Sequence, residues 1–215
     1  MPRVIIGTVD PFARVAGKGI EKMKKAGVDI EIGVMEEECR TLNKRFFTFH
    51  EKKRPYVILK WAQTFDGFID INREAGSYGQ PTWITGDLAL RLVHKIRSEE
   101  GAILVGTKTA EKDNPSLTVR HWPGRAPIRL LIDKELRLRH HRLNLYDKSQ
   151  ITFVFNAVND AKNKNLRLVK IDFTKNILPQ ILDVLYHENI LSMIVEGGKQ
   201  LLESFIRENL WDEAH

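Results

Sequence analysis

The stretch Met193-Ile-Val-Glu-Gly-Gly-Lys-Gln-Leu-Leu202, MIVEGGKQLL, joins an apolar run, a carboxylate, two glycines and the start of a helical pattern. The apolar run predicts a buried strand that stops at Glu196, and helical spacing begins at Lys199. Glycines at such a junction let an anion approach the first N–H groups of the helix, where the helix dipole favours negative charge. Gly197 and Gly198 would equally suit a tight loop with Glu196 in solvent, because a Gly-Gly pair is much less specific than a dinucleotide-binding fingerprint. The spacing alone leaves both interpretations open.

The same alternation of strand and helix extends over most of the chain. Strands are expected at residues 56–62, 102–105, 128–132, 151–155, 168–171 and 193–195. Helices are expected at residues 86–100, 177–188 and 199–209, the first with Thr85 as its N-cap and with Leu88, Leu92, Val93 and Ile96 on its apolar face. This alternation predicts an α/β fold with a central sheet and right-handed crossovers.

The N-terminal part is expected to form a smaller unit behind a charged boundary. Strands are expected there at residues 4–8 and 28–34, and helices at residues 20–26 and 36–50. Pro55 closes the charged stretch 51–55 and disfavours helix at Arg54, so this stretch is the expected linker. Residues 210–215 follow the last expected helix without a further strand, and we expect the chain to be cut there.

Composition excludes several classes of protein. The 215 residues are 42% hydrophobic and 29% charged, as in an ordinary soluble protein, with no apolar run of membrane-spanning length and no signal-peptide pattern. Cys39 is the only cysteine, which rules out an intrachain disulfide and suits a reducing cytoplasm. The net charge of +6 fits a solvated basic surface or a phosphorylated small molecule better than nucleic acid, because the basic residues are scattered. The histidines lack metal-ligand spacing, so no metal is expected in this chain.

The residues at the expected strand ends are the candidates for chemistry, because ligands of open α/β sheets bind there. Lys60 stands in an otherwise apolar strand, and an unpaired buried ammonium is costly, which favours a functional lysine. Arg97 lies at the edge of an apolar helix face and would suit either a surface ion pair or a phosphate. His94 is expected at the surface, and residues 106–120 are expected to form a surface connection.

Short segments between residues 54 and 213 are weak signals singly but specific as an ordered set. They are Arg54-Pro-Tyr-Val-Ile-Leu-Lys60, Phe65-Asp-Gly67, Trp83-Ile-Thr-Gly86, Ile103-Leu-Val-Gly-Thr-Lys-Thr109, Asp113-Asn-Pro-Ser-Leu-Thr-Val-Arg120, Pro127-Ile-Arg-Leu-Leu-Ile-Asp133, Val195-Glu-Gly-Gly198 and Asp212-Glu213. The set resembles the reductase domain of the bifunctional riboflavin-biosynthesis deaminase-reductases. Residues 9–19 and 42–47 look like the end of the deaminase domain of that family, without its zinc signature.

The resemblance implies a dihydrofolate-reductase-like three-layer α/β fold with a mixed, mostly parallel sheet at residues 56–215, after a remnant of a cytidine-deaminase-like α/β domain at residues 1–50. It implies NADPH-dependent reduction of the ribosyl group of a phosphorylated aminopyrimidine, with hydride transfer to C1′ of the opened or imine form. Zinc would belong only to the missing deaminase half. Family members commonly dimerise, so a homodimer is expected. The single cysteine, the scattered basic residues and the lack of a long apolar run predict a cytoplasmic protein with no nucleic-acid or membrane partner.

Site residues carry over from the resemblance position by position. The substrate contacts would be Arg97, Leu117, Arg120 and Glu196; the cofactor contacts would be Gln63, Trp83, Thr109, Asp113, Lys134, Gly198, Lys199, Gln200, Leu201, Leu202, Glu203 and Ser204. Lys60 would line the site. The hypothesis for proton transfer is that either Asp113 or Glu196 carries it out. This implication replaces the expectation of a mere surface connection at residues 106–120.

The sequence departs from the family pattern at Pro81, Gln63 and Lys134, where serine or a small residue is common. Two alternatives to this reductase are a dihydrofolate-reductase-like enzyme acting on another pterin or pyrimidine, and a non-catalytic assembly module. Phosphate-directed arginines argue against the first, and NADPH binding would argue against the second.

Overall fold

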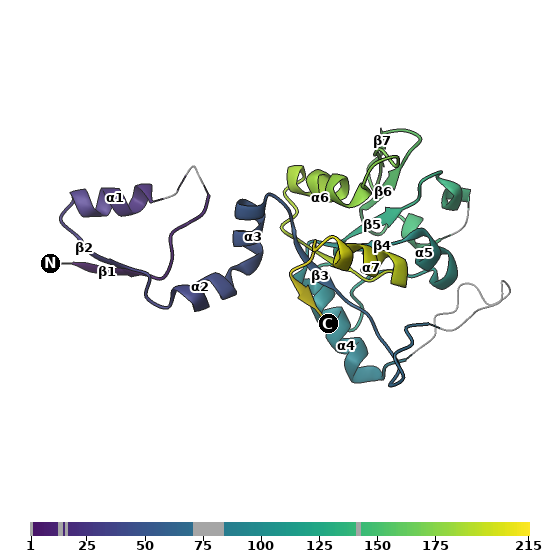
Figure 1. Ribbon diagram of the computed structural model, residues 1–215, viewed down its shortest axis with the longest axis horizontal. Helices are drawn as coiled ribbons and strands as arrows, with labels where there is room; N and C mark the ends of the chain where they lie inside the picture. Colours follow the sequence, from purple (N-terminus) through teal and green to yellow (C-terminus); the bar gives the residue numbers. More distant parts are fainter. Residues whose placement is uncertain (1, 13–14, 16, 71–83, 141–142) are drawn as a thin grey trace.

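The computed structural model describes residues 2–12, 15, 17–70, 84–140 and 143–215 (Figure 1). The N-terminal part contains β1 (Arg3–Ile6), α1 (Lys18–Lys25), β2 (Asp29–Ile32), α2 (Glu36–Leu42) and α3 (Lys44–Lys52). The larger part contains β3 (Tyr56–Leu59), α4 (Asp87–Glu99), β4 (Ala102–Val105), α5 (Thr107–Asp113), β5 (Ile128–Ile132), the 3₁₀ helices η2 (Arg137–His140) and η3 (Asn144–Tyr146), β6 (Thr152–Asn156), β7 (Ala161–Lys162), β8 (Leu166–Lys170), α6 (Ile177–His187), β9 (Ser192–Val195), α7 (Lys199–Arg207) and β10 (Glu213–Ala214).

The large part is built on one eight-stranded sheet with the strand order β10-β3-β9-β4-β5-β6-β8-β7. Every pairing in it is parallel except that of β7 with β8. The inner strands β3, β4 and β9 are buried at every position, as continuous apolar runs must be when both faces of a sheet are covered. The expected α/β fold with a mixed, mostly parallel sheet is therefore confirmed.

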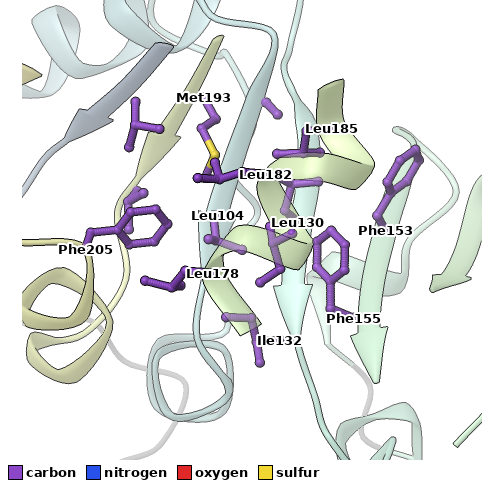
Figure 2. Close-up of a cluster of buried hydrophobic side chains, with 14 of the residues drawn as sticks. Leu104, Leu130, Ile132, Phe153, Phe155, Leu178, Leu182, Leu185, Met193 and Phe205 are labelled. Atoms are coloured by element: carbon purple, nitrogen blue, oxygen red, sulfur yellow. The ribbon is translucent and has the colours of Figure 1, made fainter. Parts of the chain in front are cut away.

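Two hydrophobic clusters lie on opposite faces of this sheet and give the fold its three layers. One cluster places side chains of α6 and α7 against Leu104, Leu130 and Met193 of the sheet (Figure 2). The other cluster covers the second face with side chains from α5 and the segments around η2 and η3. Leu117 belongs to this second cluster and is 2% exposed.

Helix α4 corrects several expectations. It begins at Asp87 with Gly86 as its N-cap, so Thr85 is not the cap. The predicted apolar face is wrong at Leu88 and Leu92, which are exposed. His94, expected at the surface, is instead fully buried. Helix α4 therefore buries a different face from the one that the spacing of its leucines predicts.

The C-terminal residues also differ from expectation. Residues 213–214 form β10, a short edge strand parallel to β3, where no strand was predicted. Its pairing continues through hydrogen bonds from the N–H of His215 to the carbonyl of Leu59 and from the N–H of Trp61 to the carbonyl of His215. A strand of two residues is too short to show the alternation or the apolar run by which strands are recognised in a sequence.

The N-terminal part is a small separate assembly that meets the large part through α3 (Figure 1). β1 and β2 form a two-stranded parallel sheet beside α1. The expected single helix at residues 36–50 is divided into α2 and α3 at Asn43, and α3 continues to Lys52. The charged stretch therefore starts inside a helix, and only residues 53–55 separate α3 from β3.

Helix α3 is attached to the large part by buried aromatics and ion pairs. Phe47 and Phe49 are nearly buried, and the ring of Phe49 lies 4.7 Å from that of Tyr186 in α6. Arg45 forms a two-pronged ion pair with Glu100, a residue only 5% exposed. Lys44 bonds Glu213 of β10 at 2.5 Å. The helix thus contacts both the sheet edge and α6.

Candidate functional site

A cavity of about 1160 Å³ opens at the carboxyl ends of the parallel strands. Its wall contains the residues that follow four strands: Lys60 after β3, Gly106 after β4, Asp133 after β5 and Glu196 after β9. The strand register explains this gathering, because Leu59 and Leu104 both pair with Val195 and Val105 pairs with Leu131. A volume of this size exceeds that of an ordinary drug-sized site and can hold two ligands together.

The Gly197–Gly198 turn lies in the cavity wall, and each of the two glycines is required for a different structural reason. A Cβ on Gly197 would lie 2.7 Å from the Cα of Val105 and 2.8 Å from the N of Gly106, so this residue must be glycine for packing. Gly198 has a φ of 57°, in the left-handed region, and caps the start of α7. Its carbonyl accepts the first helical bonds, from Leu201 and Leu202. The N–H groups ahead of them have no acceptor within the helix, as at any helix start.

Glu196 and Arg97 form a buried pair at the base of this turn. The Nε of Arg97 donates to one carboxylate oxygen of Glu196 at 2.9 Å, and its Nη2 donates to the other at 2.6 Å. The two side chains are 13% and 9% exposed. Burial alone would raise the pKa of the Glu196 carboxyl, but the charge and hydrogen bonds of Arg97 and the charge of Lys60 hold that pKa below its ordinary value. Glu196 is therefore an ionised, oriented hydrogen-bond acceptor.

Most predicted site residues line this one cavity. They are Lys60, Thr109, Asp113, Lys134, Glu196, Gly198, Lys199, Gln200, Leu201, Leu202 and Ser204. Thr109 lies over the turn, with its Oγ1 3.0 Å from the position of a Cβ on Gly198. The Ser204 hydroxyl donates to the Gln200 carbonyl, and Leu202 also packs in the core. The ends of the strands, α5 and the start of α7 thus meet at this cavity.

The remaining predicted residues lie elsewhere. Gln63 is exposed and accepts a hydrogen bond from the indole of Trp61, and exposed Glu203 lies 3.6 Å from Lys199. The side chain of Leu117 points into the core, and that of Arg120 is exposed outside the cavity wall. Trp83 and Pro81 lie outside the described residues.

Several features of the site were not predicted from the sequence. Helix α5 occupies residues that read as a polar connection, and its Thr107 hydroxyl bonds the Ile132 carbonyl at 2.5 Å, which joins α5 to β5. Lys108 and Arg137 also line the cavity. Asp133 lines it too, but its carboxylate accepts the N–H groups of Arg137 and Leu138 and so caps η2. A polar residue directly after a buried strand was the available signal for Asp133.

No cluster of three or more metal-ligating side chains exists among the residues that the structure describes. Among the same residues, no helix has both the length and the apolarity needed to span a bilayer.

The fold and its cavity define a dihydrofolate-reductase-like α/β protein with a ligand site at the carboxyl edge of the sheet. The chain belongs to the RibD C-terminal domain family, which it matches over residues 55–215. The riboflavin biosynthesis protein RibD of Aquifex aeolicus is 38% identical over 218 residues, covering 98% of this chain and 59% of the relative. That of Bacillus amyloliquefaciens is 32% identical, with 99% and 58% covered.

Solved structures agree with this assignment. A deaminase/reductase structure from Thermotoga maritima, titled diaminohydroxyphosphoribosylaminopyrimidine deaminase/5-amino-6-(5-phosphoribosylamino)uracil reductase, superposes with a TM-score of 0.84 at 35% identity. The superposition covers 97% of this chain and 57% of the Thermotoga maritima chain. The yeast riboflavin biosynthesis reductase Rib7, at 23% identity and a TM-score of 0.57, shares the fold. The chain spans rather less than two thirds of the length of its RibD relatives.

Proposed function

We propose that this chain is the reductase part of a riboflavin-biosynthesis protein and that it reduces 5-amino-6-(5-phosphoribosylamino)uracil to the ribitylamino product with NADPH. The observation that carries the proposal is that Glu196 and Lys60 line one cavity together with the Gly197–Gly198 turn, while Arg97 pairs with Glu196. Family membership supplies the reaction class. Residues 1–50 would be the end of the deaminase part, and zinc would belong to the remainder of that part.

The cavity has the features that a dinucleotide requires. The left-handed Gly198 brings the backbone at the start of α7 into the cavity wall, where helix N–H groups can receive a pyrophosphate. Lys108 and Lys134 are exposed cations on the same wall, and neither forms an ion pair with another described residue. These lysines suit the 2′-phosphate that distinguishes NADPH from NADH. When bound, the cofactor would supply the hydride.

Glu196 and Lys60 would orient and protonate the substrate. An ionised carboxylate whose plane is fixed by Arg97 accepts hydrogen bonds from sugar hydroxyls but is a poor proton donor. Reduction of the open-chain imine adds hydride to C1′ and a proton to nitrogen. The Lys60 side chain lines the cavity close enough for its charge to act on Glu196, whereas Asp113, the carboxylate also hypothesised for proton transfer, lies on the α5 wall. We assign orientation to Glu196 and proton delivery to Lys60.

The proposal is tested by NADPH oxidation with the phosphoribosylaminouracil substrate, followed by identification of the product. Glu196→Gln should lower turnover by roughly 10²-fold or more while NADPH affinity, read from tryptophan fluorescence, stays within about twofold. Asp113→Asn tests the other carboxylate. Glu99→Gln is the matched control, because Glu99 is an exposed carboxylate of α4 facing Lys95 at 4.0 Å.

Three outcomes would count against the proposal. Unchanged turnover in both Glu196→Gln and Asp113→Asn would remove the carboxylates from the mechanism. Reduction of an unphosphorylated pterin in preference to the aminouracil would indicate a different reductase. Absence of NADPH binding at micromolar concentration would indicate an assembly module.

A further inference from the structure

His94 is a fully buried histidine to which the proposed mechanism gives no role. Its Nδ1 accepts a hydrogen bond from the backbone N–H of Arg120 at 3.1 Å. An accepting Nδ1 carries no proton, so the neutral ring holds its proton on Nε2. The Nε2 is buried and has no hydrogen-bond partner among the described residues. The ring is therefore held by one backbone contact and by packing, including an edge-on contact with His121 at 4.8 Å.

The contact belongs to a two-point attachment between α4 and the segment 117–120. One helical turn beyond His94, the Nη1 of Arg97 donates to the carbonyl of Thr118 at 3.3 Å. Leu117, at the start of the segment, has a φ of 50° and anchors its side chain in the core. A leucine in the left-handed region is strained and persists only where its surroundings impose it. The segment is thus fixed at residues 117, 118 and 120, and the exposed Arg120 side chain stands at its end.

The surroundings keep the ring neutral. The pKa of His94 is lowered to about 4, mainly by burial and then by the neighbouring charges of Arg97, His121 and Arg120, against the opposing charge of Glu196. These groups come from α4, from the 117–121 segment and from the end of β9. A protonated His94 could not accept the Arg120 N–H, so neutrality and the attachment depend on one another.

We propose that neutral His94 is a positioning residue that docks the 117–120 segment on α4 and thereby holds the Arg120 side chain at a fixed place relative to the Arg97–Glu196 pair. Because Arg120 lies outside the cavity wall, it would recognise the phosphate of a substrate that extends beyond that wall. This inference rests on the proposed function. It adds a residue that touches neither ligand and acts through the backbone of Arg120. Loss of His94 should therefore affect binding of the phosphorylated end of the substrate and leave the cofactor alone.

The experiment compares three substitutions at position 94. His94→Asn keeps an acceptor close to the place of Nδ1, His94→Gln moves the polar atoms to the place of Nε2, and His94→Leu removes the acceptor. We expect His94→Leu and His94→Gln to raise the KM for the phosphorylated substrate about tenfold, the worth of one buried hydrogen bond, and His94→Asn to raise it about threefold or less. The KM for the dephosphorylated substrate and the NADPH affinity should not change.

His187→Leu is the control, because His187 is an exposed histidine whose ring contacts only its own helix and its neighbour Tyr186 among the described residues. Should His94→Leu fail to fold, the Asn and Gln variants still decide. Equal KM values in those two variants, or equal losses with both substrates, would overturn the proposal. Nitrogen-15 spectra of the ring must show the proton on Nε2 at neutral pH, and the opposite tautomer would also overturn it. A wild-type chain that reduces neither substrate would reject the proposed function, while the tautomer measurement would still judge the docking contact.

Discussion

Gly197→Ala is the substitution whose effect the structure specifies most closely. The added Cβ would lie 2.7 Å from the Cα of Val105 and 2.8 Å from the N of Gly106, both of them backbone atoms. Carbon atoms pack at about 3.5 Å, so relief requires a shift of roughly 0.8 Å. β4 is paired on both sides, with β9 and β5, and cannot yield. The 196–198 loop must therefore move outward.

We expect Gly197→Ala to cost about 2–3 kcal/mol in the free energy of unfolding, at the upper end for overpacked sites. A displacement approaching 1 Å at a catalytic wall costs on the order of 10²-fold in turnover, and Glu196 is the adjacent residue. Urea unfolding and NADPH oxidation measure the two effects. Gly198→Ala should cost about 1–2 kcal/mol, because its φ of 57° strains a side chain.

Gly106→Ala is the control for this prediction, since it lies on the opposing loop. Its φ is −83°, and the nearest atom to a Cβ there is the Leu201 Cδ2 at 4.0 Å. We expect a loss of about 1 kcal/mol or less. A Gly197→Ala variant as stable and active as Gly106→Ala would refute the packing explanation of the first glycine.

Three further predictions follow from other contacts. Asp212→Asn removes the charge that pairs with Arg54 at 2.5 and 2.9 Å and should cost about 3 kcal/mol in urea unfolding; a loss below 1 kcal/mol would contradict it. Lys134→Gln should weaken NADPH binding about threefold in fluorescence titrations and leave NADH binding unchanged; equal losses for both would exclude a role at the 2′-phosphate. His94 binds a proton in the unfolded chain at pH values where the folded chain, with its pKa of about 4, does not. Stability should therefore fall between about pH 6.5 and pH 4 by up to about 3 kcal/mol, and His94→Leu should lose this dependence.

Much of the fold was predictable because its strands are short apolar runs that end at Gly, Asp, Lys or Glu. β4 and β5 were predicted with their observed bounds, and β3, β6, β8 and β9 to within a few residues. The cavity followed from the rule that ligands bind at the strand ends of a parallel sheet. Periodicity failed at α4, because one polar residue, His94, is its most buried member while two leucines are exposed.

The pairing of Arg97 with Glu196 could not be predicted, since it joins residues that are 99 positions apart. Sequence reasoning gave these two residues separate roles at the ligand. The structure shows instead that each one orients the other. Helix α5 was missed for a similar reason, because its polar residues face a cavity that only the assembled sheet creates.

The attachment of α3 determines where this polypeptide can be divided. Arg45 and Phe49 lie before the charged stretch in sequence, yet Arg45 pairs with Glu100 and lies over the Tyr56 ring of β3, and Phe49 packs on Tyr186 of α6. A chain that began near Pro55 would lack these contacts and would leave the buried Glu100 without the Arg45 that pairs with it. The polypeptide is therefore best divided at Asn43, between α2 and α3, whether by proteolysis or by recombination of the N-terminal and large parts with other partners.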